Sequence, residues 1–272
     1  MVVTLQIFLD SRQFVILLLL GLFLGGCGAS LSPSEPVAAD RPDLVVTQRQ
    51  GREKTPGIVR WEPIDGLPRD VAIMESVFWE PADTGSLRMK IFSDARMPGS
   101  TVLEIGTGSG LVSLCCLQAG AANVVATDLN PKAIENARFN AAEMKFTERL
   151  DARPVPRRAP EAWTVINPEE TFDFIISNPP WENRKPVSVE EFALYDPDFQ
   201  LLQSLVTGAR TRLRPDGRIW LAYGCVTAIR RIQEVAAEQQ LSCTLLDDRS
   251  LDSLPEVFLP GMLIEIRVPD AR

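Results

Sequence analysis

The sequence contains no histidine among its 272 residues. This absence excludes Ser-His-Asp and Cys-His catalysis, histidine-ligated metals and histidine proton shuttles. The five cysteines include no Cys-x-x-Cys pair, so we expect neither a zinc finger nor a disulfide framework. We therefore expect no metal site, and we interpret the adjacent Cys115 and Cys116 as small buried apolar residues.

Positive charge is also scarce. Lysine and arginine number 28 against 36 aspartates and glutamates, which gives a net charge of −8 and a pI of about 4.8. This balance argues against a protein that coats nucleic acid through bulk charge, although a local basic groove stays open as an option. A hydrophobic content of 45% and a charged content of 24% are ordinary for a globular protein and argue against disorder throughout.

The apolar run at residues 15–24, VILLLLGLFL, is too short to span a bilayer, which needs about 20 apolar residues. It has the length of a signal-peptide core. The stretch Leu24-Gly25-Gly26-Cys27 that ends it resembles a bacterial lipobox. We therefore expect cleavage before Cys27, lipidation of that cysteine and attachment to a membrane. The alternative is a wrongly chosen start codon or a buried apolar segment, which would leave the protein in the cytoplasm.

The chain is predicted to have three parts. Residues 1–26 are the signal-like segment, residues 27–56 a flexible linker, and residues 57–272 the folded domain. The linker holds four prolines among polar residues and has little apolar periodicity, so it cannot bury a core. Roughly 215 residues remain, which is enough for one well-packed domain.

Strands and helices alternate from residue 100 onward. Short apolar runs predict strands, and longer runs with an apolar face predict helices. The expected strands are 101–105, 123–127, 150–155, 172–177, 218–223, 241–246 and 262–268. The expected helices are 111–119, 131–144, 198–212 and 227–239, with a Pro-Asp-Gly turn at 215–217. Such alternation implies an α/β fold with a mostly parallel sheet and helices on both faces.

The first chemical motif is a glycine-rich turn after the strand 101–105. Gly106, Gly108 and Gly110 let the backbone turn sharply, approach a ligand closely and enter a helix. Asp128 ends the next strand, and a carboxylate there can accept both hydroxyls of a ribose. The spacing is G-x-G-x-G, and no P-loop Gly-Lys-Ser/Thr follows. The motif thus predicts a nucleoside-containing ligand, against the alternative of a merely structural turn.

The second motif is Asn178-Pro179-Pro180-Trp181, directly after the strand 172–177. Each proline holds the residue before it in an extended conformation. The stiff segment is expected to project the Asn178 amide oxygen and the Pro179 carbonyl, two acceptors that suit an –NH2 group. Trp181 can stack on a flat substrate group. A plain Pro-Pro turn is the alternative, but it does not explain the asparagine before it or the aromatic residue after it.

These two motifs together resemble the class I S-adenosylmethionine-dependent methyltransferases that carry an Asn-Pro-Pro-aromatic motif. The stretch at residues 77–84, VFWEPADT, is similar to a segment of release-factor glutamine methyltransferases and their N6-adenine relatives. The resemblance implies a Rossmann-like, seven-stranded sheet with an antiparallel last strand. It implies S-adenosyl-L-methionine as cofactor, and Asn178, Pro179 and Trp181 as the residues that bind the target nitrogen. The implied cofactor residues are Thr84, Glu104, Gly106, Thr107, Gly108, Gly110 and Asp128.

The methyl acceptor stays open at this point. A protein glutamine and an adenine N6 of nucleic acid are the leading candidates, and a small-molecule amine is the third. Arg184 and Lys185 follow the motif and could meet a phosphate. A lipid-anchored binding module that keeps the fold without turnover is the alternative from another class. The resemblance would also imply an acidic residue after the third strand, where Pro154-Val155-Pro156-Arg157 stands instead.

Overall fold

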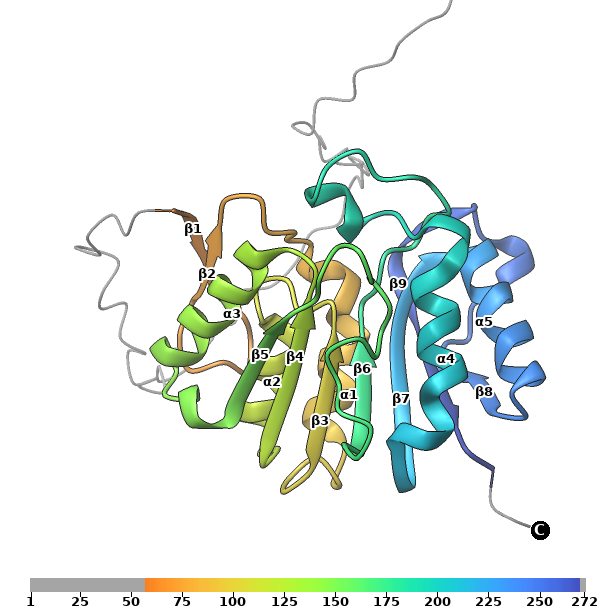
Figure 1. Cartoon of the computed structure of the whole chain (residues 1–272), viewed down its shortest axis with the longest axis horizontal. Helices are drawn as coiled ribbons and strands as arrows, with labels where there is room; N and C mark the ends of the chain where they lie inside the picture. The colour runs from red at the N-terminus through yellow and green to blue at the C-terminus, as the bar shows by residue number, and fades with distance from the viewer. Residues whose placement is uncertain (1–56, 270–272) are drawn as a thin grey trace, which may run out of the picture. The chain divides into compact units, whose positions relative to one another are not determined.

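The protein is described by a computed structural model, which covers residues 57–269. The predicted signal segment, the linker and Cys27 lie outside these residues. A central sheet with helices on both sides forms the described part (Figure 1). Its seven strands are β3 (Thr101–Ile105), β4 (Asn123–Asp128), β5 (Leu150–Pro154), β6 (Phe172–Ser177), β7 (Leu213–Cys225), β8 (Ser242–Leu245) and β9 (Val257–Arg267). The helices are α1 (Gly85–Ser93), α2 (Leu111–Gln118), α3 (Pro131–Glu143), α4 (Gln200–Arg212) and α5 (Val226–Glu238).

The strand order is β5-β4-β3-β6-β7-β9-β8. The pairs from β5 to β7 are parallel, and β9 runs antiparallel to both of its neighbours. The predicted Rossmann-like fold with an antiparallel last strand is therefore confirmed. The chain proceeds from β3 toward β5 and then returns to place β6 on the other side of β3. This reversal creates a switch point between the carboxyl ends of β3 and β6, where open α/β sheets bind ligands.

The core consists of two apolar layers, one on each face of the sheet. Alternate residues of each strand enter different layers, as the period of two requires. In β6, for example, Ile175 packs with α4 and α5, whereas Phe174 and Ile176 pack with α1 and α2. Cys115 and Cys116 are fully buried in α2, which confirms their interpretation as small apolar residues.

The hairpin of β1 (Ile58–Glu62) and β2 (Val71–Met74) was not predicted. Two buried asparagines of α3 hold it on the domain. Asn140 accepts from the Ala72 N–H at 2.8 Å and donates to the Ala72 carbonyl at 2.9 Å, and Asn136 accepts from the Met74 N–H at 2.9 Å. Asn140 also donates to the Ser109 carbonyl in the glycine-rich turn, at 2.8 Å. One side chain therefore joins the hairpin to that turn.

The segment at 215–217 differs from the predicted turn, because it lies within β7 as a bulge. The register against β6 jumps from Phe172–Leu213 to Phe174–Arg218, and Asp216 takes up the excess chain with a φ of +61°. The predicted strand 218–223 is the regular part of β7 beyond this bulge. No described helix is long and apolar enough to cross a membrane.

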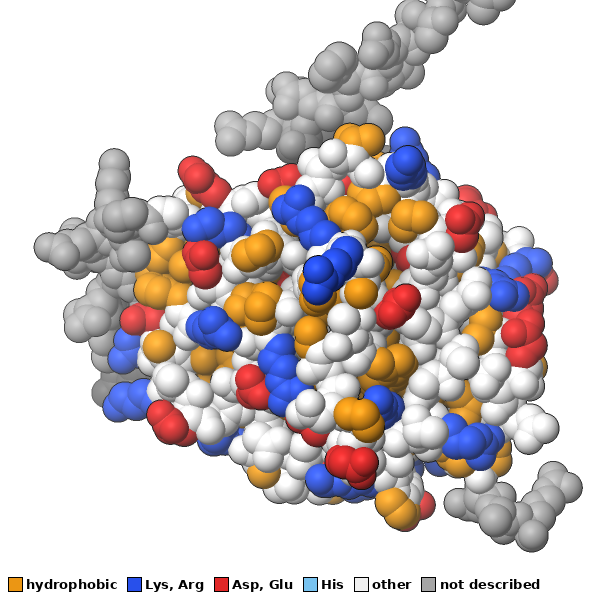
Figure 2. Space-filling view, in the orientation of Figure 1, with side chains coloured by type: hydrophobic (Ala, Val, Ile, Leu, Met, Phe, Trp, Pro, Cys, Tyr) orange, Lys and Arg blue, Asp and Glu red, His pale blue; other side chains and the backbone are white. Residues whose placement is uncertain are grey.

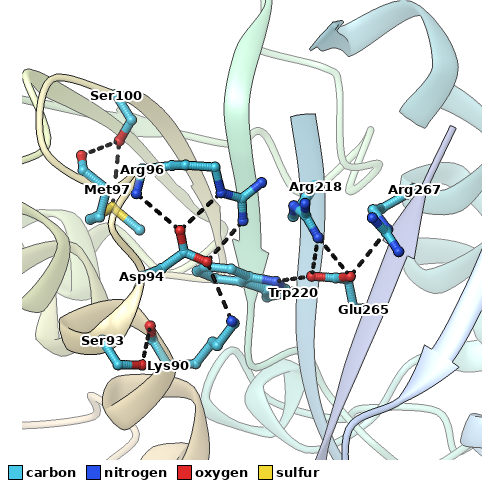
Figure 3. Close-up of polar contacts among 10 residues, drawn as sticks. All are labelled: Lys90, Ser93, Asp94, Arg96, Met97, Ser100, Arg218, Trp220, Glu265 and Arg267. Carbon is cyan, nitrogen blue, oxygen red and sulfur yellow. Dashed lines mark hydrogen bonds and ion pairs between the residues drawn. The ribbon is translucent and has the colours of Figure 1, made fainter. Parts of the chain in front are cut away.

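A charged cluster ties β7 to β9 near the amino end of β7. The Glu265 carboxylate accepts from the Trp220 indole at 3.0 Å and from Arg218 at 3.0 Å, and it pairs with Arg267 at 3.2 Å (Figure 3). Burial raises the pKa of Glu265, but these donors and charges outweigh burial and keep that pKa below its usual range. Lys90 of α1 lies 5.4 Å from the centre of the Trp220 ring. The cluster therefore attaches α1 far from the switch point, where it fixes the sheet without touching the site.

Candidate active site

The glycine-rich turn lies at the carboxyl end of β3, as predicted. Gly106, Gly108 and Gly110 all have positive φ, of +76°, +53° and +86°. A Cβ on Gly106 would meet nothing within 4 Å, so this glycine faces open space. A Cβ on Gly110 would stand 2.9 Å from the Ala137 Cα of α3. Gly106 therefore belongs to a ligand wall, whereas Gly110 allows the close approach of two helices and lines none of the pockets described below.

Glu104 supports the turn from beneath. Its carboxylate accepts from the Thr107 hydroxyl at 2.7 Å, from the Ser113 N–H at 3.0 Å and from the Ser113 hydroxyl. Burial raises the pKa of Glu104 to about 7, these hydrogen bonds oppose the rise, and the Asp128 charge adds to it. Glu104 and Thr107 also line an inner pocket, which contains Thr84, Gly106 and Asn178. Both predicted residues thus shape the turn and its inner wall.

Asp128 stands at the carboxyl end of β4 and faces the same turn. One carboxylate oxygen accepts from the Gly108 N–H at 2.9 Å, and the other accepts from the Asn130 N–H at 2.8 Å. Because each oxygen has two lone pairs, both can still accept a hydroxyl of a ligand. Asn130 in turn caps α3 by accepting from the Lys132 N–H at 3.0 Å.

A large cleft opens beside Asp128. Its walls come from the turn, from Leu129 and Asn130, from Val155 after β5, and from the segment 189–201 before and within α4. The apolar part of that segment contributes Phe192, Tyr195 and Leu201. The cleft therefore has a polar group at Asp128, and Val155 adds a further apolar side chain to its lining. The segment after β5 supplies no acid here, because the residues of that segment that line the cleft are Val155 and Pro160.

Asn178 lies where three pockets meet. It lines the large cleft, the inner pocket and an outer pocket whose walls include Glu80, Asp83, Pro179, Trp181 and Glu182. The Asn178 Oδ1 atom is buried and has no hydrogen-bond partner within the described chain. A buried amide oxygen without a partner is costly, so this atom is aimed at a donor that a ligand brings. Ser177, just before it, donates to the Ile105 carbonyl at 2.6 Å and fixes the switch point.

Trp181 is fixed in place by a hydrogen bond and by close packing of its ring. Its indole N–H donates to the Ala222 carbonyl at 3.2 Å. Its ring packs against Gly224 and Gly261, where added Cβ atoms would come within 2.4 Å and 3.3 Å of it. The two glycines of β7 and β9 therefore form a seat for the ring. Trp181 lines the outer pocket beside Pro179 from this fixed position.

The short helix η1 (Pro81–Thr84) brings two buried polar residues to opposite sides of Asn178. Thr84 lines the inner pocket near the glycine-rich turn, as predicted, and Asp83 lines the outer pocket. Phe78, just upstream, lines all three pockets. Neither Asp83 nor Phe78 was predicted, although both lie in the stretch 77–84 that carried the resemblance.

The two basic residues after the motif do not enter the outer pocket. Arg184 lies 4.7 Å from the centre of the Tyr195 ring and 3.7 Å from a Glu182 oxygen. Lys185 is exposed. In the described part of the chain, no group of three or more His, Cys, Asp or Glu side chains could hold a metal ion.

These features fit S-adenosylmethionine. The open space at Gly106 and the free lone pairs of Asp128 suit its nucleoside part. The apolar side chains that line the large cleft suit its adenine, and the inner pocket, which Asn178 also lines, suits its methionine part. The fold and this site define a class I S-adenosylmethionine-dependent methyltransferase.

A family model described as "Methyltransferase small domain" matches residues 74–237, which is more than half of the chain. The protein belongs to this family. It is an S-adenosylmethionine-dependent methyltransferase, and S-adenosyl-L-methionine is its cofactor.

The chain is similar to a release factor glutamine methyltransferase from Cereibacter sphaeroides, with 32% identity over 84% of this chain and 83% of that protein. It is similar to a chain from Methanocaldococcus jannaschii that bears the name protein N5-glutamine methyltransferase, with 30% identity over 51% of this chain and 80% of the other. Among solved structures, the SAM-dependent methyltransferase from Agrobacterium tumefaciens matches with a TM-score of 0.55 and 16% identity, over 80% of this chain and 72% of that one. That structure supports the fold alone.

Proposed function

We propose that this methyltransferase transfers a methyl group to the side-chain amide nitrogen of a glutamine in a protein. The observation that carries the proposal is the buried Asn178 Oδ1 atom, which has no partner in the described chain and faces the meeting point of the pockets. Two relatives with the word glutamine in their names support the same acceptor. Neither this atom nor the family membership favours a non-catalytic binding module.

The charge of the outer pocket favours a protein acceptor over a nucleic acid. Three carboxylates line it, from Glu80, Asp83 and Glu182, and no Lys or Arg is among the described residues that do. Apolar Leu194, 41% exposed, and Leu259, 59% exposed, stand at its walls. On the face drawn in Figure 2, basic and acidic side chains are interspersed. The carboxylates of this pocket would repel the phosphates of a nucleic acid, whereas the pocket would accommodate a peptide in which apolar residues flank the glutamine.

The residues of the site work by positioning. When bound, S-adenosylmethionine supplies a methyl group on a sulfonium centre. The Asn178 Oδ1 atom and the Pro179 carbonyl accept the two N–H groups of the acceptor, which stabilises the positive charge that develops on its nitrogen. Alignment of the two reactants contributes up to about 7–11 kcal/mol. The proton that the nitrogen loses passes to water, so no histidine is needed.

The test is transfer of radiolabelled methyl groups into fractionated protein and nucleic acid from the source cell. We expect label in one protein band and, by peptide mass spectrometry, one methyl group on a glutamine. Asn178→Ala is the control, because it removes the acceptor contact while Asp128 and the glycine-rich turn, which suit the nucleoside part of the cofactor, stay in place. Label in the nucleic-acid fraction alone would contradict the glutamine proposal and favour adenine N6.

We further propose that Leu24-Gly25-Gly26-Cys27 is a lipobox and that Cys27 becomes a lipidated first residue. The order of apolar run, glycines and cysteine supports this proposal. Mass spectrometry of the native protein tests it. A lipidated Cys27 peptide is the expected result, and an unmodified peptide that contains residues before Cys27 would refute both lipidation and membrane attachment.

A further inference from the structure

Asp83 is a buried carboxyl group in the wall of the outer pocket. It is 5% exposed and lies on η1 opposite Asn178 and Pro179. Its Oδ1 atom has no hydrogen-bond partner in the described part of the chain. Burying an acid with an unpartnered oxygen lowers the stability of the fold, so its presence at this place calls for an explanation.

The neighbouring Asn178 side chain provides this explanation. The Asn178 side-chain amide hydrogen-bonds to Asp83, while the Asn178 Oδ1 atom is left without a partner. The oxygen and the NH2 group of an asparagine have nearly the same shape, so their neighbours decide which way the amide faces. A carboxylate can only accept hydrogen bonds. It therefore holds the NH2 group toward itself and turns the oxygen toward the pockets.

We propose that Asp83 is a positioning residue of methyl transfer, which holds the Asn178 amide so that its oxygen faces the acceptor nitrogen. This inference rests on the proposed function only in requiring an –NH2 acceptor. A flipped amide would present its own N–H groups to those of the acceptor and would repel them.

The surroundings of Asp83 make its protonation, and therefore the rate of methyl transfer, depend on pH. Burial and the nearby Glu80 charge raise the pKa of Asp83 to about 6, and the hydrogen bond from Asn178 opposes the rise. Arg88 of α1 and Glu182 across the outer pocket are the other charged groups nearby. The strands behind η1 add no charge, because residues 257–264 of β9 contain no Asp, Glu, Lys or Arg.

The titratable groups of β7 behind η1 stay neutral in the relevant range. Burial raises the pKa of Tyr223 well above its usual value and that of Cys225 to about 11. Asp83 is therefore the group of this neighbourhood expected to titrate near pH 6. Below that pH, a protonated Asp83 can donate to the Asn178 oxygen, so the amide loses its fixed orientation and transfer slows.

The first test is spectroscopic and needs no acceptor. In the full chain labelled with 15N, the Asn178 side-chain NH2 resonance is identified by its loss in Asn178→Ala. We expect this resonance to titrate with a midpoint near pH 6, to lose that titration in Asp83→Asn, and to titrate at lower pH in Glu80→Gln. An Asn178 resonance that stays unchanged from pH 5 to 8 would overturn the proposal.

The second test is kinetic, with the acceptor fraction that becomes labelled. Asp83→Asn is expected to lower kcat about tenfold, since a neutral partner holds the amide less firmly than a carboxylate. It should leave the KM for S-adenosylmethionine unchanged and abolish the acidic limb of the pH profile. Asp252→Asn, an exposed acid paired with Arg230, is the matched control and should behave as the unmodified protein.

The outcomes separate the two proposals. A lower kcat in Asp83→Asn with an unchanged acidic limb, together with a lower melting temperature, would mean that Asp83 is merely structural. Label in nucleic acid would refute glutamine as the acceptor. The Asp83 inference would then still be judged by the same variants, because adenine also presents an –NH2 group.

Discussion

Replacing Asp128 with alanine should weaken binding of S-adenosylmethionine while the domain stays folded. The carboxylate is proposed to accept two ribose hydroxyls, and loss of such charge-assisted hydrogen bonds costs about 1.5–3 kcal/mol. That cost corresponds to a roughly 10- to 150-fold higher Kd. The same change removes the partners of the Gly108 and Asn130 N–H groups, at 2.9 and 2.8 Å, so a lower melting temperature of the cofactor-free protein is also expected.

Isothermal titration calorimetry of the cofactor measures the effect, and thermal unfolding shows whether the variant is folded. Asp128→Asn is not a neutral comparison, because its NH2 group would face one of the two backbone N–H donors. Asp151→Ala is better, since this exposed carboxylate on the neighbouring β5 lines none of the three pockets. Unchanged affinity in folded Asp128→Ala would refute the assignment of the ribose site.

Three further predictions concern the acceptor side and the turn. Asn178→Ala should abolish methyl transfer and leave cofactor affinity nearly intact in calorimetry. An unchanged rate of transfer would mean that the Asn-Pro-Pro-Trp motif is only a structural turn. Gly224→Ala should lower stability by about 1–3 kcal/mol and weaken acceptor binding, because its Cβ would clash with the Phe258 carbonyl and with the Trp181 ring, whereas Trp181→Phe should be tolerated. The raised pKa of Glu104, about 7 against an ordinary 4.5, means that the folded state holds its proton more tightly than the unfolded state. The free energy of unfolding should therefore fall as pH rises from about 4.5 to 7, and Glu104→Gln should flatten that fall in denaturant titrations.

Most strands of the central sheet could be predicted because they are local apolar runs between turn residues, whereas β5 (LDARP) and β8 (SCTL) are more polar and give a weaker signal. The cofactor turn and Asn178 could be predicted because the ends of parallel strands meet at one edge, so Gly106 after β3 and Asn178 after β6 had to be neighbours. The hairpin could not be predicted in this way. Its attachment depends on bonds between Ala72 and Asn140, which are 68 positions apart and leave no local periodicity.

The detailed contacts of the site could not be predicted from the sequence either. Asp83 lies in the stretch 77–84 that resembles the family, but only its burial beside Asn178 gives it a role. Trp181 was expected to meet a substrate, yet the glycines that seat it belong to two strands far along the chain. Such effects arise from contacts between distant segments, which motif spacing does not report.

The hydrogen bond from Asn140 to the Ser109 carbonyl links the hairpin to the cofactor turn, so the smallest active part of this protein includes the hairpin. The family match starts at residue 74, where β2 ends, so a unit cut to that match would omit almost the whole hairpin. Asn140 would then lose its Ala72 partners and keep only its bond to the cofactor turn. The hairpin thus stabilises the catalytic region, and the functional unit extends beyond the residues that the family model matches.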